Sequence, residues 1–336
     1  MSDTNWAKFW QSLEQIYKDE DGDLVAFEAE RPVLETALTA IAAKLTNTFT
    51  IVEPLGRGGA GVVIRLFDEH MKIDRALKLP RPRQETLVDT VRNEIDHLTQ
   101  LKHDNIIRVY DLGSVPIPQY TLPYPYFVMD FVSGVKSLRS RVEAALSDAA
   151  TAAALPKLTS WLAKQLMLIA EALTYLHRND TIHFDVKPAN ILIDSDDKPI
   201  LSDLGFAKRK IPDAPPAIVG FTLFYAHPDL RAEYHHMSDQ NRVRKSLHPK
   251  DFKFLWDIYA FGKTVLEALA LIDSSFPDAV QYDYSFVYLH LMACRMLDGH
   301  NQGKEDTLRA REHQAQSGEP LSVYRETWLN FEARDF

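Results

Sequence analysis

The sequence predicts an α+β chain of two lobes, in which a small lobe rich in β-strands precedes a larger helical lobe. Between about residues 50 and 130 the chain consists of short segments rich in β-branched and aromatic residues and bounded by Gly, Pro or Asp, which is typical of strands. One helix, at about 86–101, interrupts them. From about residue 137 onward apolar residues recur at helical spacing, most clearly at about 157–177. We expect a cleft between the lobes, where ligands are commonly bound.

Two helices are predicted ahead of the strands. Residues 5–19 and 31–45 carry apolar side chains at helical spacing, and a short acidic stretch separates them. The aromatic stripe of Trp6, Phe9 and Trp10 either binds a partner or packs on the small lobe. We therefore predict an amino-terminal helical extension over 1–46, a small lobe over 47–130, and a large lobe over 131–336 that includes an insertion at about 231–250 and a carboxy-terminal helical tail.

The composition excludes several classes of protein. The chain has 336 residues, of which 46% are hydrophobic and 25% charged, an ordinary globular composition. Its net charge of −9 does not favour binding to nucleic acid or to an anionic membrane surface. The amino terminus does not resemble a signal peptide, and no apolar run reaches membrane-spanning length. With one cysteine, Cys294, we expect a cytoplasmic protein without a membrane segment or a disulfide framework.

A glycine-rich loop joins the first two predicted strands. It contains Gly56, Gly58 and Gly61, and a β-branched run follows from Val62. A dinucleotide-binding loop would lead into a helix, whereas this loop leads into a strand. Glycines at these positions let backbone N–H groups approach polyphosphate oxygens, although three glycines alone also make a tight hairpin turn.

Lys78 lies in the third predicted strand. On a strand it shares a face with Ala76, while the leucines on either side point to the core. An ammonium group in a cleft needs a carboxylate partner to stay charged and oriented. Glu94 is the best candidate, and Asp96 and Glu85 compete with it by composition only. An exposed strand lysine is the alternative if Lys78 is taken alone.

The segment HFDVKPANIL, residues 183–192, places Asp185 between Phe184 and Val186. An ionised carboxylate that is desolvated among apolar neighbours is costly unless it is paired or used. Asp185 is therefore either tied up structurally or takes part in chemistry.

These motifs together resemble the signature set of the eukaryotic-type (Hanks-type) serine/threonine protein kinase family. The matching positions, in order along the chain, are Gly56, Gly58, Gly61, Val63, Lys78, Glu94, His183, Asp185, Lys187, Asn190, Asp203 and Gly205. Their order and spacing agree with the family over roughly residues 50–270, which makes the resemblance highly specific. It implies a bilobal protein-kinase-like fold with a nucleotide in the cleft.

The resemblance implies a site for ATP and Mg²⁺. The glycine-rich loop covers the phosphates, Lys78 contacts them and pairs with Glu94, and Asp203 and Asn190 hold Mg²⁺. By position in the family, the adenine site consists of Val63, Ala76 and Leu192, with Met129 as the gatekeeper and Asp130 to Val132 as the hinge.

The resemblance also implies a site for a protein hydroxyl. Asp185 orients the hydroxyl and accepts its proton, and Lys187 lies near the transferred phosphoryl group. Thr222 falls where members directed to serine or threonine carry a threonine that contacts the catalytic Asp and Lys. Asp257 falls where an aspartate of a large buried helix braces the catalytic loop. The implied partners are therefore protein substrates with serine or threonine hydroxyls.

Phe184 stands where the family carries an arginine that binds a phosphate on the activation loop. The loop itself, residues 206–221, contains no Ser, Thr or Tyr. We hypothesise that this kinase does not need activation-loop phosphorylation and that Phe184 packs against the loop. A degenerate, inactive site is the alternative, but decay would be expected to remove the lysine and metal positions too, and these are present.

Two further departures are milder. Leu204 stands where the family carries phenylalanine after the metal-binding aspartate, and it can fill the same apolar slot. Asp229 replaces a glutamate whose partner in the family is an arginine, for which Arg295 and Arg309 are the candidates.

Two other functions fit parts of the pattern. A small-molecule kinase of the aminoglycoside-phosphotransferase type shares the catalytic aspartate and the metal positions, but Lys187 and the pair Pro228 and Asp229 are atypical of that group. A pseudokinase that acts as a binding module is the second alternative, and the complete set of site residues argues against it.

Overall fold

The computed structural model describes residues 3–21, 24–45, 48–58, 61–80, 98–118, 120, 123–148, 152–231, 242–276, 293, 296 and 297. Contacts divide the chain into two units. The amino-terminal unit comprises Met1–Ser133 with Asp203–Gly205, and the carboxy-terminal unit comprises Gly134–Ser202 with Phe206–Phe336. Among the helices in the described part of the chain, none is long and apolar enough to cross a membrane.

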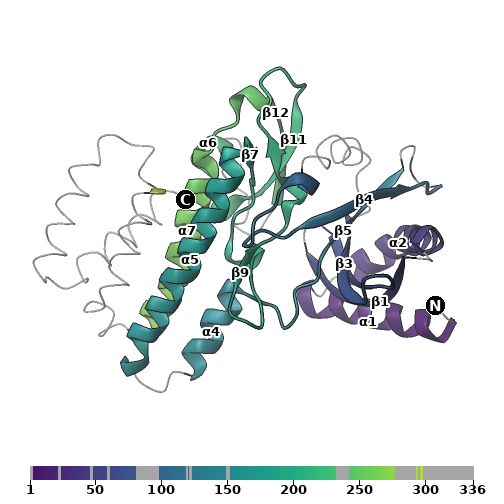
Figure 1. Ribbon diagram of the computed structural model, residues 1–336, viewed down its shortest axis with the longest axis horizontal. Coiled ribbons are helices and arrows are strands. Elements are labelled where there is room, and N and C mark those ends of the chain that lie inside the picture. Colours follow the sequence, from purple (N-terminus) through teal and green to yellow (C-terminus); the bar gives the residue numbers. More distant parts are fainter. Residues whose placement is uncertain are drawn as a thin grey trace, which may run out of the picture. The chain divides into compact units, whose positions relative to one another are not determined.

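The amino-terminal unit contains a five-stranded antiparallel sheet in the order β1-β2-β3-β5-β4. Figure 1 labels β1, β3, β4 and β5 of this sheet. Its strands are β1 (Phe49–Gly58), β2 (Gly61–Asp68), β3 (Ile73–Pro80), β4 (Val109–Val115) and β5 (Tyr124–Asp130). The predicted helix at about 86–101 lies mostly outside the described residues, of which 98–100 are helical.

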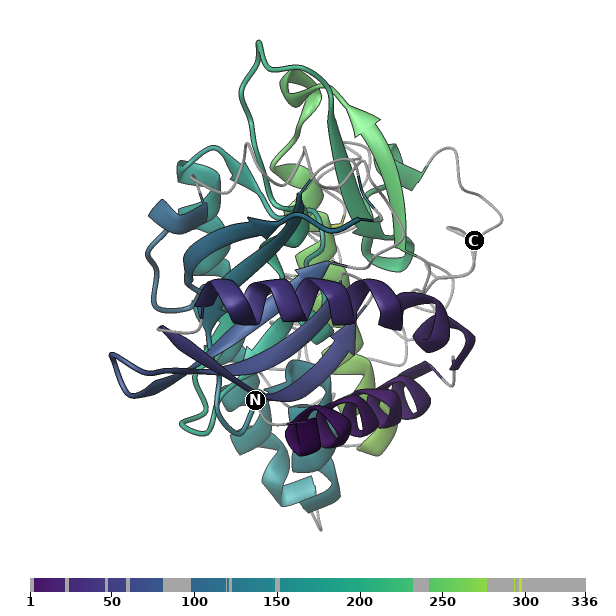
Figure 2. The ribbon, with the colours of Figure 1, turned by 90° about the vertical axis from the view of Figure 1, so that its right-hand side faces the viewer.

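Two helices, α1 (Asp3–Asp21) and α2 (Leu24–Leu45), cover one face of this sheet (Figure 2). The aromatic stripe of α1 packs on the sheet, since Phe9 and Trp10 are buried in a core that also contains strand residues and Trp6 lies against it. This contact favours packing over the alternative of a partner-binding stripe. The helices and the sheet thus share one apolar core.

The second helix begins earlier than the sequence predicts. The expected start was residue 31, but α2 begins at Leu24 and continues through Pro32. A proline inside a helix removes one backbone hydrogen bond and normally kinks or ends the helix. Here Ala26 and Phe27, which precede the proline, are fully buried in the shared core. Their burial holds the first turns of α2 in place in spite of the proline.

The two faces of the sheet carry different kinds of side chain, because side chains alternate in direction along a strand. Ile64 and Leu66 of β2 and Leu77 and Leu79 of β3 point into the core that the helices cover. Lys78, between the two leucines, points to the opposite face. The two helices therefore cover the face of the sheet opposite to the one that carries Lys78.

The carboxy-terminal unit is mainly helical. Its helices are α4 (Leu138–Asp148), α5 (Leu155–Arg178), α6 (Pro228–Arg231) and α7 (Leu255–Ser275). The helix predicted at about 157–177 is confirmed as α5, whose apolar stripe is buried and which has a proline in its first turn and basic residues in its last. Arg139 of α4 donates to Glu267 of α7 at 3.1 Å, which ties these helices together.

Short sheets position the loops of this unit. Their strands are β6 (Lys136–Ser137), β7 (Thr181–Ile182), β8 (Ile191–Ile193), β9 (Pro199–Leu201), β10 (Lys208–Arg209), β11 (Ala217–Thr222) and β12 (Arg242–Leu247). They pair as β6-β8-β9, β10-β7 and β11-β12. A sheet-rich unit and a helical unit confirm the predicted α+β class.

Candidate active site

Lys78 and Asp203 form an ion pair in the amino-terminal unit. Both side chains are nearly buried, and they border a small pocket. The other residues that line this pocket are Leu98, Ile107, Val109, Phe127, Met129, Leu204 and Gly205. Glu94, the predicted partner of Lys78, lies outside the described residues. The pocket therefore brings together one cation, one carboxylate and an apolar wall.

Asp203 has a left-handed backbone, with φ of 60°. Few residues other than glycine adopt this conformation, and such strain is concentrated at functional sites. A side chain at Gly205 would place its Cβ 3.3 Å from Oδ1 of Asp203. The glycine leaves room beside the carboxylate oxygen that accepts from Lys78.

Gly61 begins β2 at the end of the glycine-rich loop. Its φ is +147°, and a Cβ there would overlap the carbonyl oxygen of Leu79 on the neighbouring strand. Gly61 pairs with Gly58 on β1, and Gly56 pairs with Val63. Only glycine fits at position 61, because the two backbones approach so closely.

The predicted adenine residues are divided between the two units. Ala76 on β3 and Met129 on β5 are cross-strand partners. The carboxylate of Asp130 accepts from Tyr110 at 2.7 Å and from Arg75 at 3.2 Å. Val63 lies on β2, Val132 follows β5, and Leu192 lies on β8 of the carboxy-terminal unit.

Asp185 is buried in the carboxy-terminal unit, and its two carboxylate oxygens have different partners. Oδ1 accepts from the hydroxyl of Thr222 at 2.7 Å and from its backbone N–H at 3.0 Å. Oδ2 accepts from the amide of Asn190 at 3.0 Å and lies 3.3 Å from Nζ of Lys187. Lys187 also donates to the Thr222 hydroxyl at 2.8 Å. The structure therefore brings together the four predicted residues Asp185, Lys187, Asn190 and Thr222.

Asp257 holds the backbone just before this aspartate. It is fully buried on α7 and accepts from the backbone N–H groups of His183 at 2.8 Å and Phe184 at 2.9 Å. Nε2 of His177 lies 2.9 Å from the same carboxylate. Phe184 has φ of 68°, a left-handed conformation that is rare for an aromatic residue. The two hydrogen bonds to Asp257 stabilise this turn and so orient Asp185.

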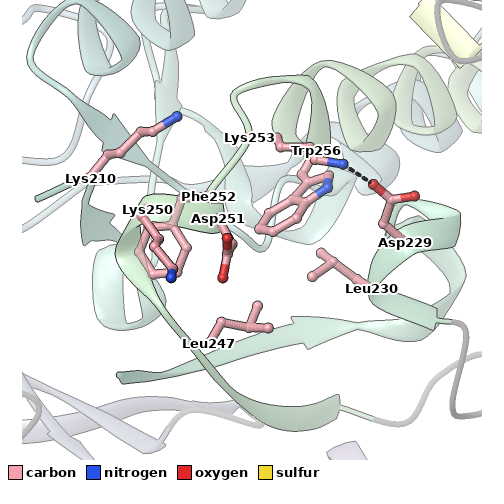
Figure 3. Close-up of a pocket in the computed structure, with 9 residues that line it drawn as sticks. All are labelled: Lys210, Asp229, Leu230, Leu247, Lys250, Asp251, Phe252, Lys253 and Trp256. Carbon is pink, nitrogen blue, oxygen red and sulfur yellow. Dashed lines mark hydrogen bonds and ion pairs between the residues drawn. The ribbon is translucent and has the colours of Figure 1, made fainter. Parts of the chain in front are cut away.

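The ring of Phe184 packs against two aromatic residues that follow β12. Its centroid lies 5.0 Å from that of Phe252 in an edge-on contact and 5.8 Å from that of Trp256. Both aromatic neighbours lie outside residues 206–221, so the predicted packing of Phe184 against that loop stays a prediction. The turn at Phe184 directs its ring to the segment leading into α7. Figure 3 shows Phe252 and Trp256 beside an open pocket.

Asp229 pairs with a lysine at this pocket (Figure 3). Nζ of Lys253 lies 2.6 Å from Oδ2 of Asp229. Burial raises the pKa of Asp229, but the hydrogen bond from Lys253 and the charge of His227 lower it more, so the net pKa lies below the usual value. Arg295 and Arg309, the predicted candidates for this partner, lie outside the described residues.

The end of the predicted activation segment is a strand. β11 pairs antiparallel with β12 in a continuous register from Ala217 opposite Leu247 to Thr222 opposite Arg242. β12 belongs to the predicted polar insertion at about 231–250. The insertion therefore pairs with the segment that carries Thr222.

A family model described as the protein kinase domain matches residues 49–270. The chain belongs to the protein kinase family. This confirms the family resemblance and the bilobal class of fold that it implied.

Several bacterial kinases are similar to this member of the family. Serine/threonine-protein kinase PknB of Mycolicibacterium smegmatis is 32% identical over 170 residues, which are 49% of this chain and 25% of PknB. A probable serine/threonine-protein kinase of Clostridium acetobutylicum is 28% identical over 175 residues, which are 49% of this chain and 23% of that protein. A probable serine/threonine-protein kinase of Streptomyces coelicolor is 29% identical over 168 residues, which are 49% of this chain and 23% of that protein. The matches thus span about a quarter of these longer relatives.

Three contributors to this site are not predicted from the sequence, namely β12, Lys253 and the aromatic pair of Phe252 and Trp256. One local signal was present, since aromatic residues stand at every second position at 252, 254 and 256. That spacing does not identify Phe184 as their neighbour, because the contact is distant in sequence.

Proposed function

We propose that the chain is an ATP- and Mg²⁺-dependent serine/threonine protein kinase that transfers the γ-phosphate to protein hydroxyls. The observation that carries this proposal is the arrangement at Asp185, whose Oδ1 accepts from Thr222 while Lys187 donates to the same threonine hydroxyl. A carboxylate held by fixed donors, with an ammonium group beside it, suits the orientation of a substrate hydroxyl and the stabilisation of a transferring phosphoryl group.

In the proposed reaction Asp185 orients the hydroxyl of the substrate and accepts its proton. Lys187 stabilises negative charge on the phosphoryl group, and Thr222 keeps both side chains in position. The names of the similar bacterial proteins support serine or threonine as the acceptor.

The amino-terminal unit supports the nucleotide part of the proposal. The glycine-rich segment offers backbone N–H groups that a polyphosphate can approach, and Lys78 offers an ammonium group beside the carboxylate of Asp203. Mg²⁺ is typically bound by one or two carboxylates together with phosphate oxygens. By position in the family, Asp203 and, from the carboxy-terminal unit, Asn190 would hold it. The bound ions would neutralise charge on the phosphates.

The remaining nucleotide contacts are proposed by position in the family. Gly56, Gly58 and Gly61 would lie over the phosphates, and Glu94 would pair with Lys78 when the nucleotide is bound. The adenine would contact Val63, Ala76, Met129, Asp130, Val132 and Leu192. The division into an extension over 1–46, a small lobe over 47–130 and a large lobe over 131–336 stays a prediction, as does the cytoplasmic location.

We also propose that this kinase works without phosphorylation of its activation loop. The loop over 206–221 contains no hydroxyl side chain, and Phe184 replaces the arginine that would bind a phosphate. The pairing of β11 with β12 orders the end of the segment, and the contacts of Phe184 with Phe252 and Trp256 hold the catalytic loop. Together these contacts substitute for a phosphate.

The test of the kinase activity uses the full chain with radiolabelled ATP, Mg²⁺ and a generic protein substrate. We expect transfer by the wild type and none by Lys78→Met, Asp203→Ala or Asp185→Asn, each checked for folding by circular dichroism. Transfer to small alcohols but not to protein would favour the aminoglycoside-phosphotransferase type. Tight ATP binding without transfer, unchanged in Asp185→Asn, would identify a pseudokinase.

The test of the activation mechanism uses phosphatase-treated protein and its intact mass. Unphosphorylated protein should be as active as untreated protein. A requirement for a phosphate mapped to 206–221 or to Thr222 would overturn the proposal.

A further inference from the structure

The amino-terminal helices contact the glycine-rich loop through one buried arginine. Arg57 lies on β1 between Gly56 and Gly58, and its side chain is 1% exposed. Its cross-strand partner is Val62, which belongs to the core that α1 and α2 cover. The side chain of Arg57 therefore points to the helix-covered face of the sheet.

Tyr17 of α1 and Glu30 of α2 surround this guanidinium group. Its Cζ lies 4.0 Å from the ring centroid of Tyr17, and its Nη2 lies 4.0 Å from Oε1 of Glu30. The Tyr17 hydroxyl donates to Oε2 of Glu30 at 2.7 Å, and both residues are almost completely buried. A buried charge of this kind is tolerated only with such partners, so the cluster fixes Arg57 in one position.

A fixed Arg57 constrains the loop around it. Side chains and peptide groups alternate in direction along a strand, so anchoring this side chain orients the peptide groups that flank it. Those peptide groups belong to the glycine-rich segment, where the glycines have no side chains that could anchor the backbone. Val63, which pairs with Gly56, belongs to the face that carries Lys78. Arg57 is thus anchored on the helix-covered face of the sheet, and it fixes a loop that acts on the opposite face, which carries Lys78.

We propose that the α1–α2 hairpin positions the glycine-rich loop for nucleotide through Arg57, with Tyr17, Glu30 and Arg57 as positioning residues. The inference rests on the proposed function, because it assigns nucleotide to this loop. It gives the amino-terminal helices a function in the kinase reaction in addition to covering the sheet. A purely structural cluster would stabilise the fold and leave the loop and the nucleotide affinity unchanged.

The first measurement is hydrogen exchange of the full chain without nucleotide, at the amides of residues 55–58 and 61–63. In Glu30→Gln these amides should exchange about tenfold faster, because the loop loses its anchor. The matched control is Leu13→Ala, which truncates a fully buried residue of α1 in the same core but outside the cluster. At equal loss of thermal stability it should leave exchange in the loop unchanged.

The second measurement is the Kd for a non-hydrolysable Mg·ATP analogue. It should rise about tenfold in Glu30→Gln and in Arg57→Met, and the double variant should be no weaker than either, because the two residues act as a unit. Tyr17→Phe, which removes only the hydroxyl, replaces Glu30→Gln if that variant does not fold. Unchanged exchange in the cluster variants, or an equal increase in Leu13→Ala, would overturn the inference. A wild type that binds no nucleotide would instead refute the proposed function, and the exchange measurement would still decide the positioning role.

Discussion

Thr222 donates its hydroxyl hydrogen to Oδ1 of Asp185 at 2.7 Å, and its backbone N–H donates to the same oxygen at 3.0 Å. Thr222 is the last residue of β11, whose position depends on pairing with β12. The chain of contacts therefore runs from the inserted strand, through the activation segment, to the proposed catalytic carboxylate. These contacts are the basis of the proposal that the loop needs no phosphorylation to hold Asp185.

Replacing Thr222 with alanine removes one of these two hydrogen bonds and the acceptor of Lys187. We expect Thr222→Ala to lower kcat by about 10- to 100-fold, because a misplaced base and a misplaced cation lose transition-state contacts. Thr222→Ser keeps the hydroxyl and should retain activity within about threefold. Steady-state phosphotransfer to protein, measured for the two variants side by side, checks this. Equal losses in both would contradict the role of the hydroxyl.

Replacing Phe184 with the arginine that the family carries should destabilise this chain. The arginine would bury its guanidinium group against the rings of Phe252 and Trp256, without a phosphate to pair with it. We therefore expect a loss of about 3–5 kcal/mol in the free energy of unfolding. Phe184→Leu keeps an apolar side chain and should lose about 1–2 kcal/mol. Urea unfolding followed by tryptophan fluorescence measures both. If the arginine variant were as stable as the leucine variant, the aromatic packing would not be what holds this turn.

The local part of the site could be predicted from the sequence. Asp185, Lys187 and Asn190 lie within one short segment, so their spacing along the chain fixes their proximity and the motif identifies them. The α+β class follows in the same way from the change of hydrophobic period along the chain. Short-range patterns suffice here because the interacting groups are neighbours in sequence.

The contacts that the sequence did not predict are long-range. β12 lies in a polar insertion, and its assignment as a strand depends on pairing with β11 rather than on its own composition. The start of α2 depends on burial of Phe27 against the sheet, which outweighs the local effect of Pro32. Arg57 looks like an ordinary loop arginine until Tyr17 and Glu30 are brought to it. In each case tertiary packing outweighs the local structural propensity of the residues.

Replacing Gly61 with alanine should abolish nucleotide binding. The new Cβ would overlap the carbonyl oxygen of Leu79 and force β2 away from β3 at the end of the glycine-rich loop. Gly134→Ala is the matched control, since that glycine also has a positive φ, of 61°, but a Cβ there would lie 3.5 Å from the nearest atom, in Ser195. We expect the control to lose about 1 kcal/mol of stability and to bind nucleotide normally. Calorimetric titration with Mg·ADP distinguishes the two, and equal affinities would show that the close approach is unimportant.

The ion pair of Lys253 and Asp229 should make stability depend on pH in the acid range. The pKa of Asp229 is lowered from its usual 3.8, so the pair stabilises the fold above that pH and this contribution is lost as the pH falls through the lower, folded value. Because Lys253 is 57% exposed, the pair contributes only about 0.5–1 kcal/mol. Lys253→Met should therefore be less stable than wild type at about pH 6, and the difference should shrink as the pH falls below 3.8 and disappear below the folded pKa of Asp229.

Lys250→Met removes the same charge from the border of the same pocket and serves as the control. The hydrogen bond to Asp229 comes from Lys253 and not from Lys250, so replacing Lys250 should not reproduce the pH-dependent difference in stability. Urea midpoints at a series of pH values measure all three proteins. A difference between Lys253→Met and wild type that persists at the acid end would mean that the methylene chain of Lys253, rather than its charge, supports this corner of the activation segment.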